Sequence, residues 1–190
     1  MVSGIILASG FSKRMKKEKL LLPLSGIPMV EYIIRAAKAS HLDEVILIYR
    51  NTGIKDIGIK YLDKIVYNDH ADQGQSAAVK LGVSASHKET DAYMFLVGDQ
   101  PFLRETIINI LIDNFKKTPS NIVVPVYNGK KGSPVIFPAR YKQELLALSG
   151  DTGGRIIIEE HKKKLNLVEI ENTEAGIDID TQNEYEKIIR

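Results

Sequence analysis

Short apolar runs alternate with amphipathic stretches along the chain. Residues 5–7, 44–49 and 93–97 are brief apolar runs of the length and residue type expected for strands buried on both faces of a sheet. Between such runs, apolar residues recur at helical spacing, most regularly along residues 108–115. This alternation predicts a three-layer, Rossmann-like α/β fold in which helices cover both faces of a mostly parallel sheet.

The second half of the chain predicts one antiparallel excursion in this sheet. Residues 122–126 and 135–137 are strand-like runs, and the Asn-Gly turn signal at 128–129 permits an antiparallel pair. Two late strands are expected at residues 165–170 and 177–179. In a mostly parallel sheet, ligands bind at the carboxyl ends of the strands, so we expect the functional residues to converge on that edge.

The loop that follows the first strand combines small residues with a cluster of basic ones. Ala8, Ser9 and Gly10 have little or no side chain, so backbone N–H groups there can approach phosphate oxygens, and Ser12 adds a hydroxyl donor. Five basic residues follow within seven positions: Lys13, Arg14, Lys16, Lys17 and Lys19. We interpret the loop as a phosphate site, although a solvated basic loop or a nucleic-acid patch would have the same charge. The spacing fits neither a Walker loop nor a dinucleotide-binding fingerprint.

Three aspartates are candidate metal ligands. Asp99 comes directly after the run at 93–97 and Gly98, where a strand would leave the core, although an Asp before Pro101 is also an ordinary turn residue. Asp178 and Asp180 flank Ile179, and strand alternation would point both carboxylates to the same face. One or two carboxylates with phosphate oxygens are a usual environment for Mg²⁺, which we expect as the cofactor.

Composition narrows the class of protein. A length of 190 residues with 44% hydrophobic content suits one domain spanning residues 1–190, and a net charge of +2 is too small to predict a nucleic-acid partner. The absence of cysteine excludes disulfides and thiolate metal sites. Apolar runs far shorter than a membrane span, with no signal peptide, predict a cytoplasmic protein with no membrane partner.

Several motifs in this order resemble those of nucleotidyltransferases similar to molybdenum cofactor cytidylyltransferase. LASGFSKRM at 7–15, followed by Lys19 and LLP at 21–23, resembles the family's first signature, with departures at Ser9 and Lys16. The later motifs that resemble this family are QGQS at 73–76, GDQP at 98–101, GSP at 132–134, GDTGGR at 150–155 and DIDT at 178–181.

The resemblance implies a nucleotidyltransferase domain and a specific reaction. CMP from CTP would be joined to the terminal phosphate of a molybdopterin-type acceptor, with release of pyrophosphate, and the product would serve a client molybdoenzyme. The alternatives are a GTP-using molybdopterin guanylyltransferase, an enzyme acting on a sugar or polyol phosphate, and a non-catalytic carrier of the cofactor. The Cβ atoms of Ala8 and Ser9 would narrow the space for the base and favour a pyrimidine over a purine.

The candidate residues fall into three overlapping groups. The expected catalytic residues are Arg14, Lys19 and Asp99. The expected nucleotide-binding residues are Leu7, Ala8, Ser9, Gly10, Ser12, Lys13, Arg14, Lys19, Gly74 and Ser76. The expected metal ligands are Asp99, Asp178 and Asp180.

Overall fold

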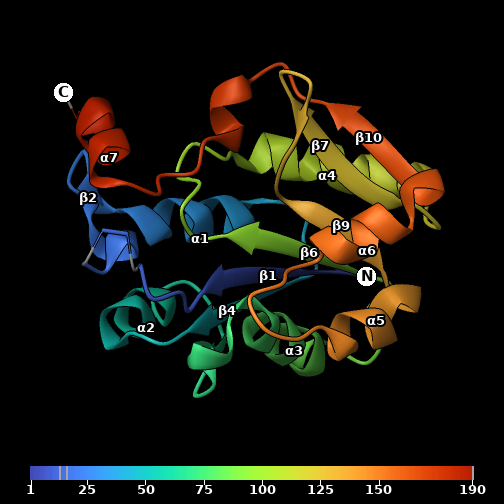
Figure 1. The fold of residues 1–190 in the computed structure, drawn as a ribbon, viewed down its shortest axis with the longest axis horizontal. Coiled ribbons are helices and arrows are strands. Elements are labelled where there is room, and N and C mark those ends of the chain that lie inside the picture. The colour runs from blue at the N-terminus through green and yellow to red at the C-terminus, as the bar shows by residue number, and fades with distance from the viewer. Residues whose placement is uncertain (13, 16, 190) are drawn as a thin grey trace.

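A mixed sheet runs through the middle of the molecule in the computed structural model, which describes all residues except Lys13, Lys16 and Arg190 (Figure 1). Its strand order is β10-β7-β9-β6-β1-β4-β5, with β8 paired to β7. The strands of this sheet are β1 (Val2–Ala8), β4 (Glu44–Tyr49), β5 (Lys64–Tyr67), β6 (Ala92–Val97), β7 (Ile122–Tyr127), β8 (Lys130–Lys131), β9 (Val135–Pro138) and β10 (Leu165–Glu169). A separate two-stranded pair is formed by β2 (Pro23–Leu24) and β3 (Ile27–Pro28).

Helices cover both faces of the sheet, as the alternating pattern predicts. The helices are α1 (Met29–Ala39), α2 (Thr52–Gly58), α3 (Gln75–Ala85), α4 (Glu105–Lys117), α5 (Lys142–Ala147), α6 (Arg155–Glu160) and α7 (Gln182–Ile189). Figure 1 shows α1 and α4 on one side of β1 and β6, with α3 on the other. Successive residues of β1 face opposite layers: Ile6 joins the core that contains α1, α2 and α4, whereas Ile5 joins the core that contains α3, α5 and α6.

The antiparallel excursion is confirmed. β1 pairs in parallel with both β4 and β6, and β10 pairs in parallel with β7. β9 lies between β6 and β7 and is antiparallel to both. The predicted three-layer, Rossmann-like α/β fold, with a mostly parallel sheet and one antiparallel excursion, is therefore confirmed.

The expected strand at residues 177–179 is wrong. This segment has no regular secondary structure and joins no ladder in the described part of the chain. A backbone hydrogen bond of 3.1 Å from the Ile179 N–H to the Asp99 carbonyl joins it to the end of β6, and the Ile179 side chain is fully buried. A second bond, from the Ile177 N–H to the Glu174 carbonyl, is local. The two flanking aspartates are thus placed without a strand.

Parallel pairing brings the carboxyl ends of β1 and β6 to one edge of the sheet. Figure 1 shows α7 and the segment that leads into it near β2, at the same side of the molecule as these strand ends. The Tyr185 hydroxyl of α7 donates a hydrogen bond of 2.7 Å to the Pro23 carbonyl, which fixes the C-terminal segment there. None of the helices in the described residues has the length and apolar character needed to cross a membrane.

Candidate active site

Hydrogen bonds anchor the loop that follows β1 at both of its ends. Ala8 and Ser9 are buried, and the Ser9 hydroxyl accepts a 2.9 Å hydrogen bond from the amide of Asn68, itself buried after β5. Ser12 has a left-handed backbone conformation, with φ of 48°; its hydroxyl donates to Glu18 at 3.2 Å and accepts from the Lys19 N–H at 3.3 Å. The Ser12 hydroxyl, predicted to bind phosphate, therefore organises the loop in this structure. Lys13, another predicted contact, lies outside the described residues.

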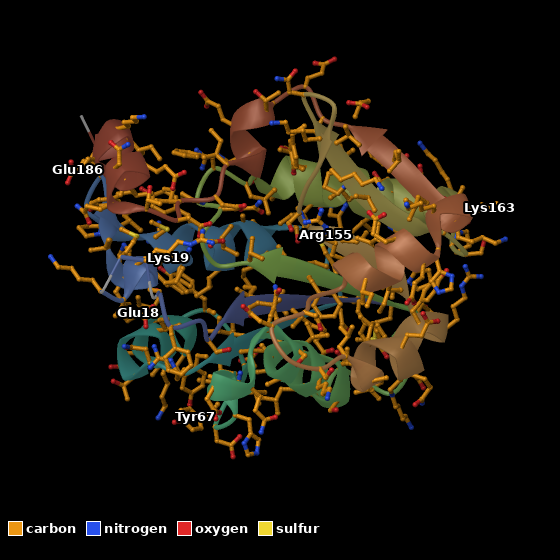
Figure 2. The ribbon with its side chains drawn as sticks, in the orientation of Figure 1. Glu18, Lys19, Tyr67, Arg155, Lys163 and Glu186 are labelled. Carbon is orange, nitrogen blue, oxygen red and sulfur yellow. The ribbon has the colours of Figure 1, made fainter. Side chains whose placement is uncertain are left out.

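A cluster of opposite charges forms where this loop meets β6 and the C-terminal segment. The Lys19 ammonium lies 2.6 Å from Asp99 Oδ2 and 2.7 Å from Asp180 Oδ1, although these residues are 80 and 161 positions away in the sequence. Arg14 donates from the other side, with its guanidinium 2.9 Å from Asp180 Oδ2. The side chains of Lys19 and Asp99 are only 13% and 19% exposed, so this pair is largely shielded from water. All three predicted catalytic residues, Arg14, Lys19 and Asp99, therefore lie in one cluster. The label of Lys19 in Figure 2 marks the position of this cluster.

The charges of the cluster stabilise one another. Burial lowers the pKa of Lys19, but the charges and hydrogen bonds of Asp99 and Asp180 outweigh burial, so the pKa lies above its ordinary value. In return, the hydrogen bond from Lys19 is the largest cause that holds the pKa of Asp180 below its ordinary value. Lys19 and Asp180 are therefore both ionised at neutral pH.

Asp178 has a different environment from Asp180. It lies beside a cleft of about 1270 Å³, where solvent reaches it, yet surrounding protein atoms and the charge of Asp99 raise its pKa to about 6. Burial and the charge of Asp178 also raise the pKa of Tyr127, whose hydroxyl donates to the Ser133 carbonyl at 2.8 Å. The two aspartates flanking Ile179 are consequently unequal: Asp180 forms ion pairs with Arg14 and Lys19, whereas Asp178 forms none within the part of the chain that the structure describes.

We expect opposite effects of Asp178→Asn and Asp180→Asn on the stability of the metal-free protein. Folding raises the pKa of Asp178, so ionising this carboxyl lowers the free energy of unfolding. This cost is absent below about pH 4 and complete above about pH 6. Asp178→Asn removes it. The lowered pKa of Asp180 contributes stability at neutral pH that is lost as the pH falls, so Asp180→Asn removes a gain. After allowance for solvent screening, the effect of Asp178→Asn is about 1 kcal/mol, or about 2–4 °C in Tm, whereas for Asp180→Asn the prediction is the opposite direction.

Thermal denaturation in EDTA, at neutral pH and at about pH 4, measures both variants. Asp178→Asn should raise Tm at neutral pH, and this difference should shrink at about pH 4 because Asp178 is then protonated in the folded protein. Asp180→Asn should lower Tm at both pH values, because the gain from Asp180 is lost only as the pH falls through its lowered pKa. Shifts in the same direction at neutral pH would contradict the unequal environments of the two carboxylates.

Gly74 and Ser76 lie at the start of α3, where they meet another loop. The backbone of Gly74 has φ of 89°, and a Cβ there would come within 2.6 Å of the Gly150 carbonyl oxygen. The Ser76 N–H donates to that same oxygen at 3.2 Å, and the Gln75 N–H donates to the Asp151 carboxylate at 3.3 Å. These predicted nucleotide contacts are therefore joined to the 150–154 loop at the edge of the cleft, apart from the Lys19 cluster.

The cleft connects the two halves of the site. Its floor is largely apolar and includes Leu7 at the end of β1, Phe95 of β6 and Tyr127 of β7. Charged side chains border it, among them Asp178 near the Lys19 cluster and Arg155 at the start of α6. Figure 2 shows Arg155 over the second half of the sheet, well separated from Lys19. The geometry can hold a large ligand with its charged end toward Lys19.

Comparison with known proteins identifies the family. Residues 4–165 match the MobA-like NTP transferase domain. The chain belongs to the MobA-like NTP transferase family. Its match to a molybdenum cofactor nucleotidyltransferase-like family confirms the resemblance drawn from the motifs, and the chain is a nucleotidyltransferase.

The curated relatives of this MobA-like protein are named for different processes. The purine catabolism protein PucB of Bacillus subtilis is 29% identical over 98% of this chain and 95% of its own length. A probable molybdenum cofactor guanylyltransferase of Bacillus anthracis is 27% identical over 96% of this chain and 93% of its own length.

Solved structures share the fold. Rv0371c of Mycobacterium tuberculosis superimposes with a TM-score of 0.87 and 22% identity over 99% of this chain and 96% of its own. A nucleotidyl transferase from Methanothermobacter thermautotroptrophicus superimposes with a TM-score of 0.84 and 22% identity, covering 99% of this chain and 95% of its own.

The carboxylates of this MobA-like chain form an oxygen-rich set. Asp99 Oδ1 is buried and has no hydrogen-bond partner among the described residues, while its other oxygen accepts from Lys19. A buried carboxylate oxygen without a partner is costly and needs an explanation. With Asp178 and Asp180 nearby, the set has the oxygen chemistry that hard divalent cations bind.

Some residues of the MobA-like site escaped the sequence analysis. The hydrogen bond from Asn68 to Ser9 joins residues 59 positions apart and left no signal in the sequence. The structure also brings Glu144, Glu160 and His161 together, with ligand atoms within 4.8 Å of one another. That surface group lies on α5 and the end of α6, away from the Lys19 cluster, and His161 is occupied by a 2.8 Å contact with Glu144.

Proposed function

We propose that this nucleotidyltransferase transfers CMP from CTP to the terminal phosphate of molybdenum cofactor (molybdopterin) and releases pyrophosphate. The observation that carries the proposal is the contact of Lys19 with both Asp99 and Asp180. Their neighbours in sequence, Gln100 and Asp178, line a cleft large enough for a bulky acceptor. The resemblance of the motifs supports CTP and the molybdopterin acceptor. A client molybdoenzyme that receives the product in the cytosol completes the proposal.

The reaction needs no covalent intermediate on the protein. An oxygen of the acceptor phosphate attacks the α-phosphorus of CTP in line, the bond from that phosphorus to the bridging oxygen breaks, and pyrophosphate leaves with the electron pair. The task of the protein is to position the two phosphates and to neutralise their charge. Lys19 and Arg14 supply positive charge for the triphosphate and for the leaving pyrophosphate.

Asp99, with Asp178 or Asp180, would hold Mg²⁺. The unpartnered oxygen of Asp99 and the two nearby carboxylates fit a hard cation. When bound, Mg²⁺ would supply further positive charge to the phosphate oxygens. Asp178, which lacks a lysine or arginine partner in the described residues, is available for this role without breaking an ion pair, whereas Asp180 must first release Lys19.

The cleft supports an acceptor larger than a polyol phosphate. Its volume of about 1270 Å³ exceeds the upper end of ordinary ligand pockets, roughly 1,000 Å³. The apolar floor around Phe95 and Tyr127 suits a flat ring system, and the nearby cations Lys131 and Arg155 suit anionic substituents. A sugar or polyol phosphate would leave much of this apolar surface uncovered.

GTP is the specific alternative to CTP, because one of the relatives is named a molybdenum cofactor guanylyltransferase. The turn after β1 supports CTP, because Ala8 and Ser9 both carry a Cβ and a hydrogen bond from Asn68 holds the Ser9 hydroxyl. A turn with these two Cβ atoms and this hydrogen bond leaves less room for a purine base than a Gly-Gly turn would leave.

Replacing Ala8 and Ser9 together by Gly is expected to relax the base preference. We expect wild type to prefer CTP in kcat/KM by about 10-fold or more, the range that steric fit alone can supply, and the double variant to lose most of that preference. Comparing kcat/KM for CTP and GTP in both proteins decides the point. A wild-type preference for GTP would overturn the choice of CTP and leave the phosphate chemistry unchanged.

The reaction itself is tested by incubating the enzyme and Mg²⁺ with each NTP and a panel of acceptors. Molybdopterin, a sugar phosphate and a polyol phosphate form the panel, and pyrophosphate release and product mass are measured together. The proposal predicts stoichiometric pyrophosphate and a CMP-molybdopterin product. Tight binding of the cofactor without pyrophosphate release would instead indicate a carrier protein.

A further inference from the structure

The Lys19 ammonium lies between two of the three carboxylates proposed to bind the divalent cation. It contacts Asp99 Oδ2 at 2.6 Å and Asp180 Oδ1 at 2.7 Å, so a single positive group joins two chain segments at short range. We infer that Lys19 has a second role as a positioning residue: before nucleotide binds, it takes the place of the metal and holds both carboxylates until the triphosphate draws it away. The inference rests on the proposed function, since it concerns the same metal and triphosphate.

The balance of charges explains why a cation is needed there. Asp99, Asp178 and Asp180 bring three carboxylates together, and their mutual repulsion contributes to the raised pKa of Asp178. Without Lys19, the largely shielded Asp99 would have no cationic partner among the described residues, which is costly. Lys19 thus keeps the carboxylates together in the metal-free enzyme.

Lys19 and a metal ion compete for the same carboxylates. Lys19 uses one oxygen of Asp99 and one of Asp180, and the second oxygen of Asp180 accepts from Arg14. A metal ion held by the unpartnered Oδ1 of Asp99 and a second carboxylate would lie close to the Lys19 ammonium, and the repulsion between the two cations favours moving Lys19 to another anion. The triphosphate supplies that anion.

The backbone of Lys19 can stay in place during this exchange. Its N–H donates to the Ser12 hydroxyl, which in turn donates to Glu18, and Glu18 is held by Arg50 at 2.9 Å. The flexible four-carbon side chain can then turn from the carboxylates to phosphate without moving the loop. Metal and nucleotide binding are consequently coupled: each makes the other more favourable.

Mn²⁺ binding without nucleotide tests this directly, using electron paramagnetic resonance to measure free Mn²⁺ during titration. Lys19→Met removes the ammonium and keeps an unbranched side chain of similar length. We expect it to bind Mn²⁺ about 10-fold or more tightly than wild type, within the usual range of such coupling. Arg14→Met is the matched control, because it removes the same charge from Asp180 but leaves Lys19 between the carboxylates; we expect less than about threefold change.

An unchanged Mn²⁺ affinity in Lys19→Met would overturn the inference. An equal rise of the Mn²⁺ affinity in Lys19→Met and Arg14→Met would also overturn it, because such a rise would reflect net charge alone. If Lys19→Met does not fold, Lys19→Gln provides the test, because its neutral amide also lacks the charge. The titration contains neither nucleotide nor acceptor. Its failure would leave nucleotidyl transfer standing, whereas failure of the proposed reaction would appear only in the pyrophosphate assay.

Discussion

Asp99→Asn is expected to lower kcat/KM by about 100-fold or more, the usual loss when a preorganised charged group is removed from an active site. The substitution keeps the shape of the side chain but removes the charge that pairs with Lys19 and that would hold Mg²⁺. The loss should persist at saturating Mg²⁺, because the remaining carboxylates cannot restore the same position.

Steady-state rates across a range of Mg²⁺ concentrations measure this effect. Asp113→Asn is a matched control on the exposed face of α4, where the carboxylate is 57% exposed, and it should retain wild-type activity. Folding of both variants is checked by circular dichroism. A folded Asp99→Asn enzyme with near wild-type turnover at limiting Mg²⁺ would remove Asp99 from the metal site.

Lys19→Met is expected to weaken nucleotide binding and to lower kcat together, with a combined loss in kcat/KM of about 100-fold or more. The reason is that Lys19 would neutralise the triphosphate in the ground state and the departing pyrophosphate in the transition state. Its pKa lies above the ordinary value, so the charge is present at every pH at which the enzyme is assayed.

The control for this variant is Lys17→Met, which removes a charge from the same loop at an exposed position. Nucleotide affinity from isothermal titration calorimetry and kcat from pyrophosphate release separate the two effects. If Lys17→Met and Lys19→Met lower activity equally, the loop acts through its overall charge and the specific contact of Lys19 with Asp99 has no catalytic importance.

Local patterns were enough to predict the layers of the fold. The apolar runs became the central strands β1, β4 and β6, because strands buried on both faces need continuous apolar sequence. The segment at 177–179 failed as a strand because its short apolar pattern is used to bury Ile179 alone, and its backbone makes one hydrogen bond to Asp99. A pattern of three residues does not distinguish these two uses.

The candidate site was predicted less completely than the fold. The grouping of Arg14, Lys19 and Asp99 followed from the rule that loops after parallel strands meet at one edge. The pairing of Lys19 with Asp180 could not be predicted, because it depends on where the C-terminal segment crosses that edge. Ser12 and Ser76 stay predicted nucleotide contacts. In the structure the Ser12 hydroxyl donates to Glu18, and the backbone N–H of Ser76 donates to the Gly150 carbonyl, which the sequence did not indicate.

A crystal structure with Mn²⁺ and a non-hydrolysable CTP analogue is the most direct test of the central claim, that the Lys19 cluster is the metal and triphosphate site. Anomalous scattering identifies the Mn²⁺ without assumptions about its ligands. The account predicts an anomalous peak coordinated by Asp99 and by Asp178 or Asp180, with the Lys19 ammonium moved from the carboxylates to the triphosphate. A triphosphate bound elsewhere, with Lys19 still between Asp99 and Asp180, would contradict it.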